Sequence, residues 1–133
     1  MRADDPFADA DRRLREWERR LAANTPLELS AVLEDLTALM GALVGALLCE
    51  AERPAPLPDD DLLARFKLLA RSDATWNAIR DNLRELVYYR NCLAAGRRDA
   101  LPAVPERMAI RTARHVYLYM CTRRATAGRA GQA

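Results

Sequence analysis

LTALMGALVGALLC, residues Leu36–Cys49, is a run of fourteen residues without a charge. Glu34 and Asp35 precede it, and Glu50 follows it. A helix needs about 17 to 25 predominantly apolar residues to span a membrane, so this run is too short. A helix that is apolar on most of its circumference is stable at the centre of a helical bundle. The run therefore predicts a soluble all-α protein, built around one buried helix and without membrane contact.

Apolar periodicity and helix-breaking residues predict five helices in the 133-residue chain. The predicted helices cover approximately residues 6–23, 26–53, 60–70, 73–95 and 105–124. The expected fold is a compact all-α bundle of about five helices. Residues 1–126 are expected to form a single helical-bundle domain, and residues 127–133 a flexible C-terminal tail.

Several residues are expected to mark the ends of these helices. Thr25, Pro26 and Glu28 have the spacing of a capping box at the start of the second helix. The other expected helix ends are a cap within Asp59–Asp61 for the third helix, a cap at Ser72 or Asp73 for the fourth, and Gly96 after the fourth.

Residues that commonly carry catalysis or bind metals are sparse. His115 is the only histidine, and Cys49, Cys92 and Cys121 are far apart and form no C-x-x-C pair. A single histidine cannot build a metal-binding cluster, and cysteines of this spacing favour free thiols in a reducing cytosol. The sequence contains neither a phosphate-binding loop nor a nucleophile elbow. We therefore expect a cytoplasmic protein that is not an enzyme and that has no metal and no cofactor.

The charges are divided unevenly along the chain. Residues 1–61 contain fourteen acidic and seven basic residues, a net charge of −7, whereas residues 62–133 contain five acidic and fourteen basic residues, a net charge of +9. Twenty of the basic residues are arginine, the side chain suited to bidentate phosphate contact. A GC-rich genome also favours arginine, but it does not explain the separation of charge. The acidic half is expected to dock on another copy or subunit in a head-to-tail contact.

Many of the basic residues have helical spacing. Arg80, Arg84 and Tyr88 follow one another at intervals of four residues. The predicted nucleic-acid-binding residues are Arg80, Arg84, Arg90, Arg97, Arg98, Arg107, Arg111 and Arg114. Arginines interleaved with tyrosines suit RNA or single-stranded DNA, because the charges bind phosphates and the rings stack on bases. The alternative is a solvated helix face that is paired with acidic neighbours.

The stretch YRNCLAAG, Tyr89–Gly96, resembles the motif of the HEPN ribonuclease superfamily, whose members are small helical bundles. In those nucleases an Arg-Asn pair is followed a few residues later by a histidine, and the Arg and His of two subunits converge on the RNA backbone. Arg90 and Asn91 match the pair, but Ala94 or Ala95 occupies the position of the histidine. The resemblance therefore implies an RNase or an inactive relative, in a toxin–antitoxin or defence system.

A second resemblance covers more of the chain. The length, the five-helix plan, the basic C-terminal half, the stretch LAAGRR (93–98) and the stretch VYLYM (116–120) together resemble the small helical subunit of multisubunit CRISPR effector complexes. Members of that family are bundles without catalytic residues. Several copies stack along the ribonucleoprotein, and their basic faces line the path of guide and target or displaced strand. The resemblance implies that Arg90, Arg97 and Arg98 lie near nucleic acid, with the helical stripe Arg107, Arg111 and Arg114 as further candidates.

These residues leave further alternatives open. Small residues in the second helix suit core packing or, alternatively, a self-association face; they are Ala38, Gly41, Ala42, Gly45 and Ala46. The expected partners are copies of the chain and other subunits of a ribonucleoprotein. A protein–protein adaptor whose charged ends bind only proteins is a third interpretation of the function.

Overall fold

The protein is a bundle of helices. The computed structural model describes residues 5–53 and 61–132, and these ranges contain no strand. The α-helices are α1 (Pro6–Ala22), α2 (Leu29–Glu50), α3 (Leu62–Ser72), α4 (Arg80–Ala94) and α5 (Pro105–Gln132), and the short 3-10 helices are η1 (Ala74–Ile79) and η2 (Arg98–Ala100). The predicted all-α bundle of five helices is confirmed.

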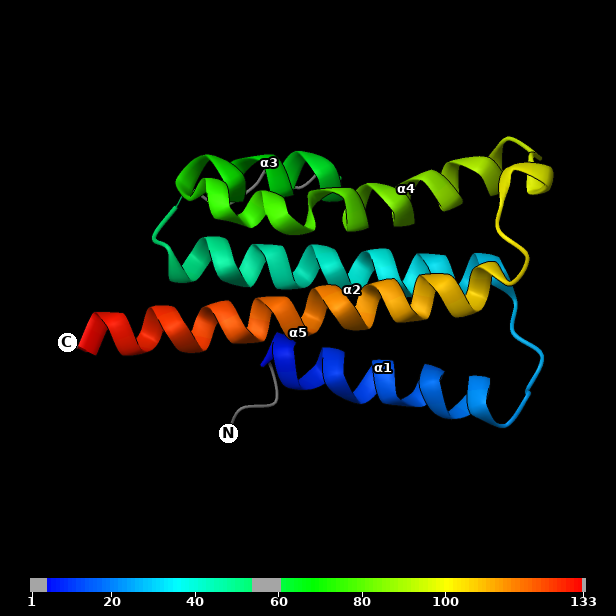
Figure 1. Ribbon diagram of the computed structural model, residues 1–133, viewed down its shortest axis with the longest axis horizontal. Coiled ribbons are helices and arrows are strands. Elements are labelled where there is room, and N and C mark those ends of the chain that lie inside the picture. The colour runs from blue at the N-terminus through cyan, green and yellow to red at the C-terminus, as the bar shows by residue number, and fades with distance from the viewer. Residues whose placement is uncertain (1–4, 54–60, 133) are drawn as a thin grey trace.

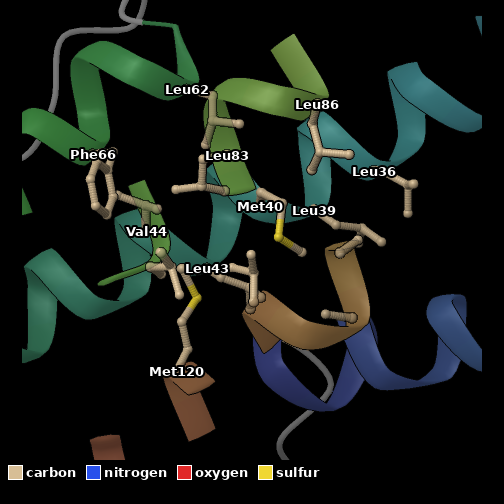
Figure 2. Close-up of a cluster of buried hydrophobic side chains, with 14 of the residues drawn as sticks. Leu36, Leu39, Met40, Leu43, Val44, Leu62, Phe66, Leu83, Leu86 and Met120 are labelled. Carbon is tan, nitrogen blue, oxygen red and sulfur yellow. The ribbon is translucent and has the colours of Figure 1, made fainter. Parts of the chain in front are cut away.

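Helix α2 lies at the centre of the bundle, between the pair α3 and α4 and the pair α1 and α5 (Figure 1), and it contacts all four. One cluster of buried apolar side chains joins the five α-helices. In Figure 2, Met40 and Leu43 of α2 lie among Leu83 of α4, Phe66 of α3 and Met120 of α5. Each fully buried side chain of this size contributes about 1.5–3 kcal/mol. The predicted central position of this helix is confirmed.

Among the described residues, α2 is the single helix that is long and apolar enough to span a membrane, with a mean hydropathy of 1.8 over its most apolar window. Burial accounts for much of this composition, because 61% of the window is enclosed by the rest of the protein. The apolar run around Leu36–Cys49 is therefore explained by the core that it forms.

Aspartate side chains begin three of the described helical segments. Asp61 accepts a hydrogen bond from the Ala64 amide at 2.9 Å, and Asp73 accepts one from the Thr75 amide at 3.0 Å. Asp5 caps α1 in the same way. The predictions of a cap at Asp73 and at the end of the acidic run are confirmed, while Asp59 and Asp60 lie outside the described residues.

The capping box expected at Thr25 is wrong. Helix α2 begins at Leu29, and Glu28 at its N-cap makes no side-chain capping bond. The physical reason is that Thr25 belongs to the end of the preceding helix, where its amide donates to the Arg20 carbonyl at 3.0 Å. The Ser30 hydroxyl donates to Glu28 at 2.9 Å.

Helix α4 ends in a Schellman motif. Gly96 has φ +70°, its amide donates to the Leu93 carbonyl at 3.1 Å, and the Arg97 amide donates to the Cys92 carbonyl at 2.8 Å. Glycine adopts this left-handed conformation without the steric penalty of a Cβ. The prediction that Gly96 ends the helix is confirmed.

Two predicted boundaries differ from those of the structure. The fourth helical segment begins with the 3-10 turn η1, and α5 continues to Gln132, beyond the expected end at Arg124. Residues 125–132 contain no proline, and their alanines favour a helix, so nothing in the sequence stops the helix at Arg124. The flexibility of residues 127–133 stays a prediction.

Candidate nucleic-acid interface

A groove of about 380 Å³ separates α3 from the start of α4, and we call it the basic groove. Its lining residues are Leu63, Phe66, Lys67, Ala70, Asn77, Arg80 and Arg84. Its charged groups are all cations, because none of the described residues that line it is acidic. Leu63 and Ala70 give it an apolar wall.

Each helix buries its apolar side in the core, and this burial leaves the cations on the exposed side. Leu62, Phe66 and Leu69 of α3 are buried in the core, which leaves the neighbouring Lys67 exposed at the edge. Ile79 and Leu83 are buried in the same way, so Arg80 and Arg84 lie on the exposed side of α4. The groove therefore presents its charges from regular, well-packed elements.

Ion pairs within the protein hardly neutralise the groove. Lys67 and Arg84 form no ion pair with any residue in the part of the chain that the structure describes. Arg80 approaches Asp81 at 3.8 Å, but the Asp81 side chain is 87% exposed, so solvent screens this contact. These three cations stay available to an anion from outside.

Arg114 is held inside the bundle instead. Its guanidinium donates to Asp11 at 2.8 Å and to Glu18 at 2.8 and 2.9 Å, and its side chain is only 19% exposed. Hydrogen bonds to Glu18 and then Asp11 raise the pKa of Arg114 above its usual value. The hydrogen bond from Arg114 lowers the pKa of Asp11. We call these three residues the α1–α5 clamp.

The other predicted arginines lie at separate places. Arg90 is half-buried and lines a second groove of about 470 Å³, beside α2 and the N-terminus of α3. Arg97 pairs with Asp99 through two hydrogen bonds of 2.9 and 3.0 Å, next to the exposed Arg98. Arg107 and Arg111 are exposed on α5. The structure thus brings together Arg80 and Arg84, but it does not bring all eight residues to one surface.

Ion pairs within the fold occupy some arginines of the basic half, and those of Arg114 and Arg124 reach the acidic half. Besides the α1–α5 clamp, Arg124 pairs with Glu50 at 2.7 Å and Arg123 with Asp73 at 2.6 Å. Three arginines of the basic half therefore bind acidic residues on other elements. The alternative interpretation, a solvated helix face paired with acidic neighbours, agrees with the pairing of these three residues, although the Arg114 side chain is only 19% exposed.

Sequence reasoning missed Lys67, the one lysine of the chain. Its spacing on the third helix shows that it leaves the core side, but no local pattern shows which helix lies beside it. The packing of α3 against η1 and α4 supplies that information. The one signal in the sequence was the position of Lys67 directly after Phe66, a buried aromatic residue.

Two alanines stand where the ribonuclease motif has its histidine, and the one histidine of the chain lies on another helix. Ala94 and Ala95 are exposed at the end of α4, and His115 is exposed on α5. Within the described ranges, no group of three or more His, Cys, Asp or Glu is arranged to hold a metal ion.

The fold and the site together define a five-helix bundle with a cationic groove between two helices. No family model matches the chain, and no curated protein or solved structure matches it significantly.

Proposed function

We propose that this protein is a non-catalytic subunit of a nucleic-acid-guided ribonucleoprotein of the CRISPR effector type, and that it binds nucleic-acid backbone through the basic groove. The observation that carries the proposal is the set of three cations around one groove, without an acidic residue in its described lining. Lysine and arginine contacts to phosphates position a strand without reading its sequence. Binding of this kind suits a subunit whose partners supply sequence recognition.

The number of charges also supports repeated copies in an assembly. Three cations that neutralise three phosphates of a single strand give a salt slope of only about −2, and so few phosphate contacts are expected to give a modest affinity. Linking several such sites along one strand raises the overall affinity without any new contact. Stacking with copies of itself and with other cytoplasmic subunits is therefore part of the proposal.

The experiment measures binding of fluorescently labelled short RNA and single-stranded DNA by anisotropy, at about 50 and about 200 mM salt. The groove variant carries Lys67→Glu and Arg84→Glu. The matched control carries Arg12→Glu and Arg19→Glu, the same change of charge on the exposed side of α1. A third variant carries Arg107→Glu and Arg111→Glu on α5.

We expect the groove variant to lose the salt-sensitive binding and the α1 control to keep it. If the α5 variant alone loses binding, the interface is the α5 face and not the groove. If the wild-type protein binds neither ligand, alone or in its reconstituted assembly, the proposed function is wrong. Circular dichroism verifies that each variant is folded.

Arg90 supports a second candidate, a HEPN-like RNase or an inactive relative of one. Arg90 lines the second groove with Glu34 and Asp61, and it forms no ion pair with a described residue. Metal-independent cleavage of RNA that is lost in Arg90→Ala supports this candidate over the first. Protein partners that remain after nuclease treatment, without bound nucleic acid, support an adaptor instead.

A further inference from the structure

Tyr88 is a large side chain that the core does not use. It is 51% exposed on α4, whereas the neighbouring Tyr89 is buried. The two ring centroids are 6.4 Å apart and the rings are tilted by 57°, and the burial of Tyr89 fixes this side of the helix against the core. Packing in the core therefore does not explain the presence of an aromatic ring at this position.

Tyr88 continues the line of cations that leaves the basic groove. Arg80, Arg84 and Tyr88 are each four residues apart in one helical segment, which corresponds to steps of about 6 Å along the axis and small rotations around it. A side-chain hydrogen bond with Cys92, one turn further along α4, raises the pKa of the Tyr88 hydroxyl and holds this end of the ring to the helix. The exposed ring therefore follows Arg84, a cation of the groove, by about one turn of the same helix.

We infer that Tyr88 is a base-stacking residue, and that the ligand of the basic groove is single-stranded nucleic acid rather than a duplex. This inference rests on the proposed function. Bases in a duplex stack on one another, so their faces are closed to a side chain. A single strand held by Arg80 and Arg84 at its phosphates presents open base faces to a ring one turn further along the helix.

Chemistry of this kind accepts every base, because each base has a π-face. The cations fix the backbone, the ring fixes one nucleotide, and neither reads base edges. The ligand class is thus a single strand of RNA or DNA without sequence preference. The side chain that distinguishes it from a duplex is Tyr88.

The test compares Tyr88→Ala with wild-type protein, using labelled single strands of RNA and DNA and the corresponding duplexes. Losing one base–aromatic stack is expected to weaken single-strand binding about 5- to 150-fold and to leave duplex binding unchanged. Tyr88→Phe retains the ring and is expected to restore single-strand binding. Leu118→Ala is the matched control, because Leu118 is 54% exposed on α5, away from this line.

The outcomes separate the inference from the function on which it rests. If the groove variant loses binding but Tyr88→Ala binds single strands like the wild type, the stacking role is wrong and the proposed function stands. If Tyr88→Ala weakens the binding of single strands and of duplexes equally, Tyr88 does not stack on a base. If no nucleic acid binds the wild-type protein, both proposals fail. If the affinities for single-stranded RNA and single-stranded DNA differ, the strand that binds more tightly identifies the type of ligand.

Discussion

Arg114 shows how a single residue can be assigned a role that its helical spacing does not reveal. It shares a stripe with Arg107 and Arg111 in the sequence, yet its guanidinium binds two carboxylates of α1. The stripe predicts which residues share a side of the helix. It cannot predict which of them meets carboxylates on a helix some hundred residues away, because that contact is tertiary.

Arg114→Ala is expected to lower the free energy of unfolding by about 1–3 kcal/mol, because charge-assisted hydrogen bonds are lost and two carboxylates are left unpaired. Arg111→Ala is the matched control, since Arg111 is exposed one turn away and its replacement is expected to stay within about 0.5 kcal/mol. Urea denaturation measures both. Equal effects of the two substitutions would show that the α1–α5 clamp does not stabilise the fold.

The clamp also predicts a dependence on pH. The pKa of Asp11 is lowered in the folded state, so its contribution is fully present above the unfolded pKa of about 3.9 and is lost as the pH falls through the folded pKa. The stability difference between wild type and Arg114→Ala is therefore expected to be constant near neutral pH and to shrink below about pH 4. A difference that stays constant down to acidic pH contradicts this assignment.

At the scale of elements, the ends of the helices follow simple stereochemistry. Helices α1, α2 and α4 all close with the Schellman pattern of hydrogen bonds. Gly96 and Asn24 suit the left-handed residue of that motif, and the sequence identifies Gly96 easily. Glu52 occupies the same position after α2 with φ 57°, although a glutamate side chain disfavours it.

Glu52→Gly is expected to stabilise the protein by about 0.5–1 kcal/mol, since removing the Cβ relieves the left-handed strain and outweighs the added freedom of the unfolded chain. The control is Ala51→Gly at the preceding residue, whose φ of −83° strains no Cβ and where glycine is expected to destabilise. Thermal unfolding measures both. Changes of the same sign at the two positions would contradict the expectation.

At the scale of the whole molecule, much of the architecture follows from one apolar helix. The uncharged run around Leu43 leaves α2 no stable place except among the other helices, and the sequence therefore predicts the bundle. The basic groove is less predictable, because it depends on α3 lying beside the start of α4. The predicted capping box at Thr25 failed because a residue between two helices can serve either one, and packing decides between them.

Leu43→Ala tests how strongly the bundle depends on its centre. Leu43 is fully buried, so the substitution is expected to cost about 2–5 kcal/mol from lost apolar contacts and the remaining cavity. That is a large share of a total stability of about 5–15 kcal/mol. Leu118→Ala on the surface is the control, and urea denaturation is the measurement. A cost below about 1 kcal/mol at Leu43 would contradict a central role for α2.

The α1–α5 clamp has a consequence for synthesis on the ribosome. Asp11 is made before Arg114, which follows 103 residues later. At about 5–20 residues per second, α1 waits about 5–20 seconds for the side chain that joins Asp11 and Glu18 to α5. The bundle therefore cannot complete itself from its first helices, and the nascent chain reaches its final form only after α5 has left the exit tunnel.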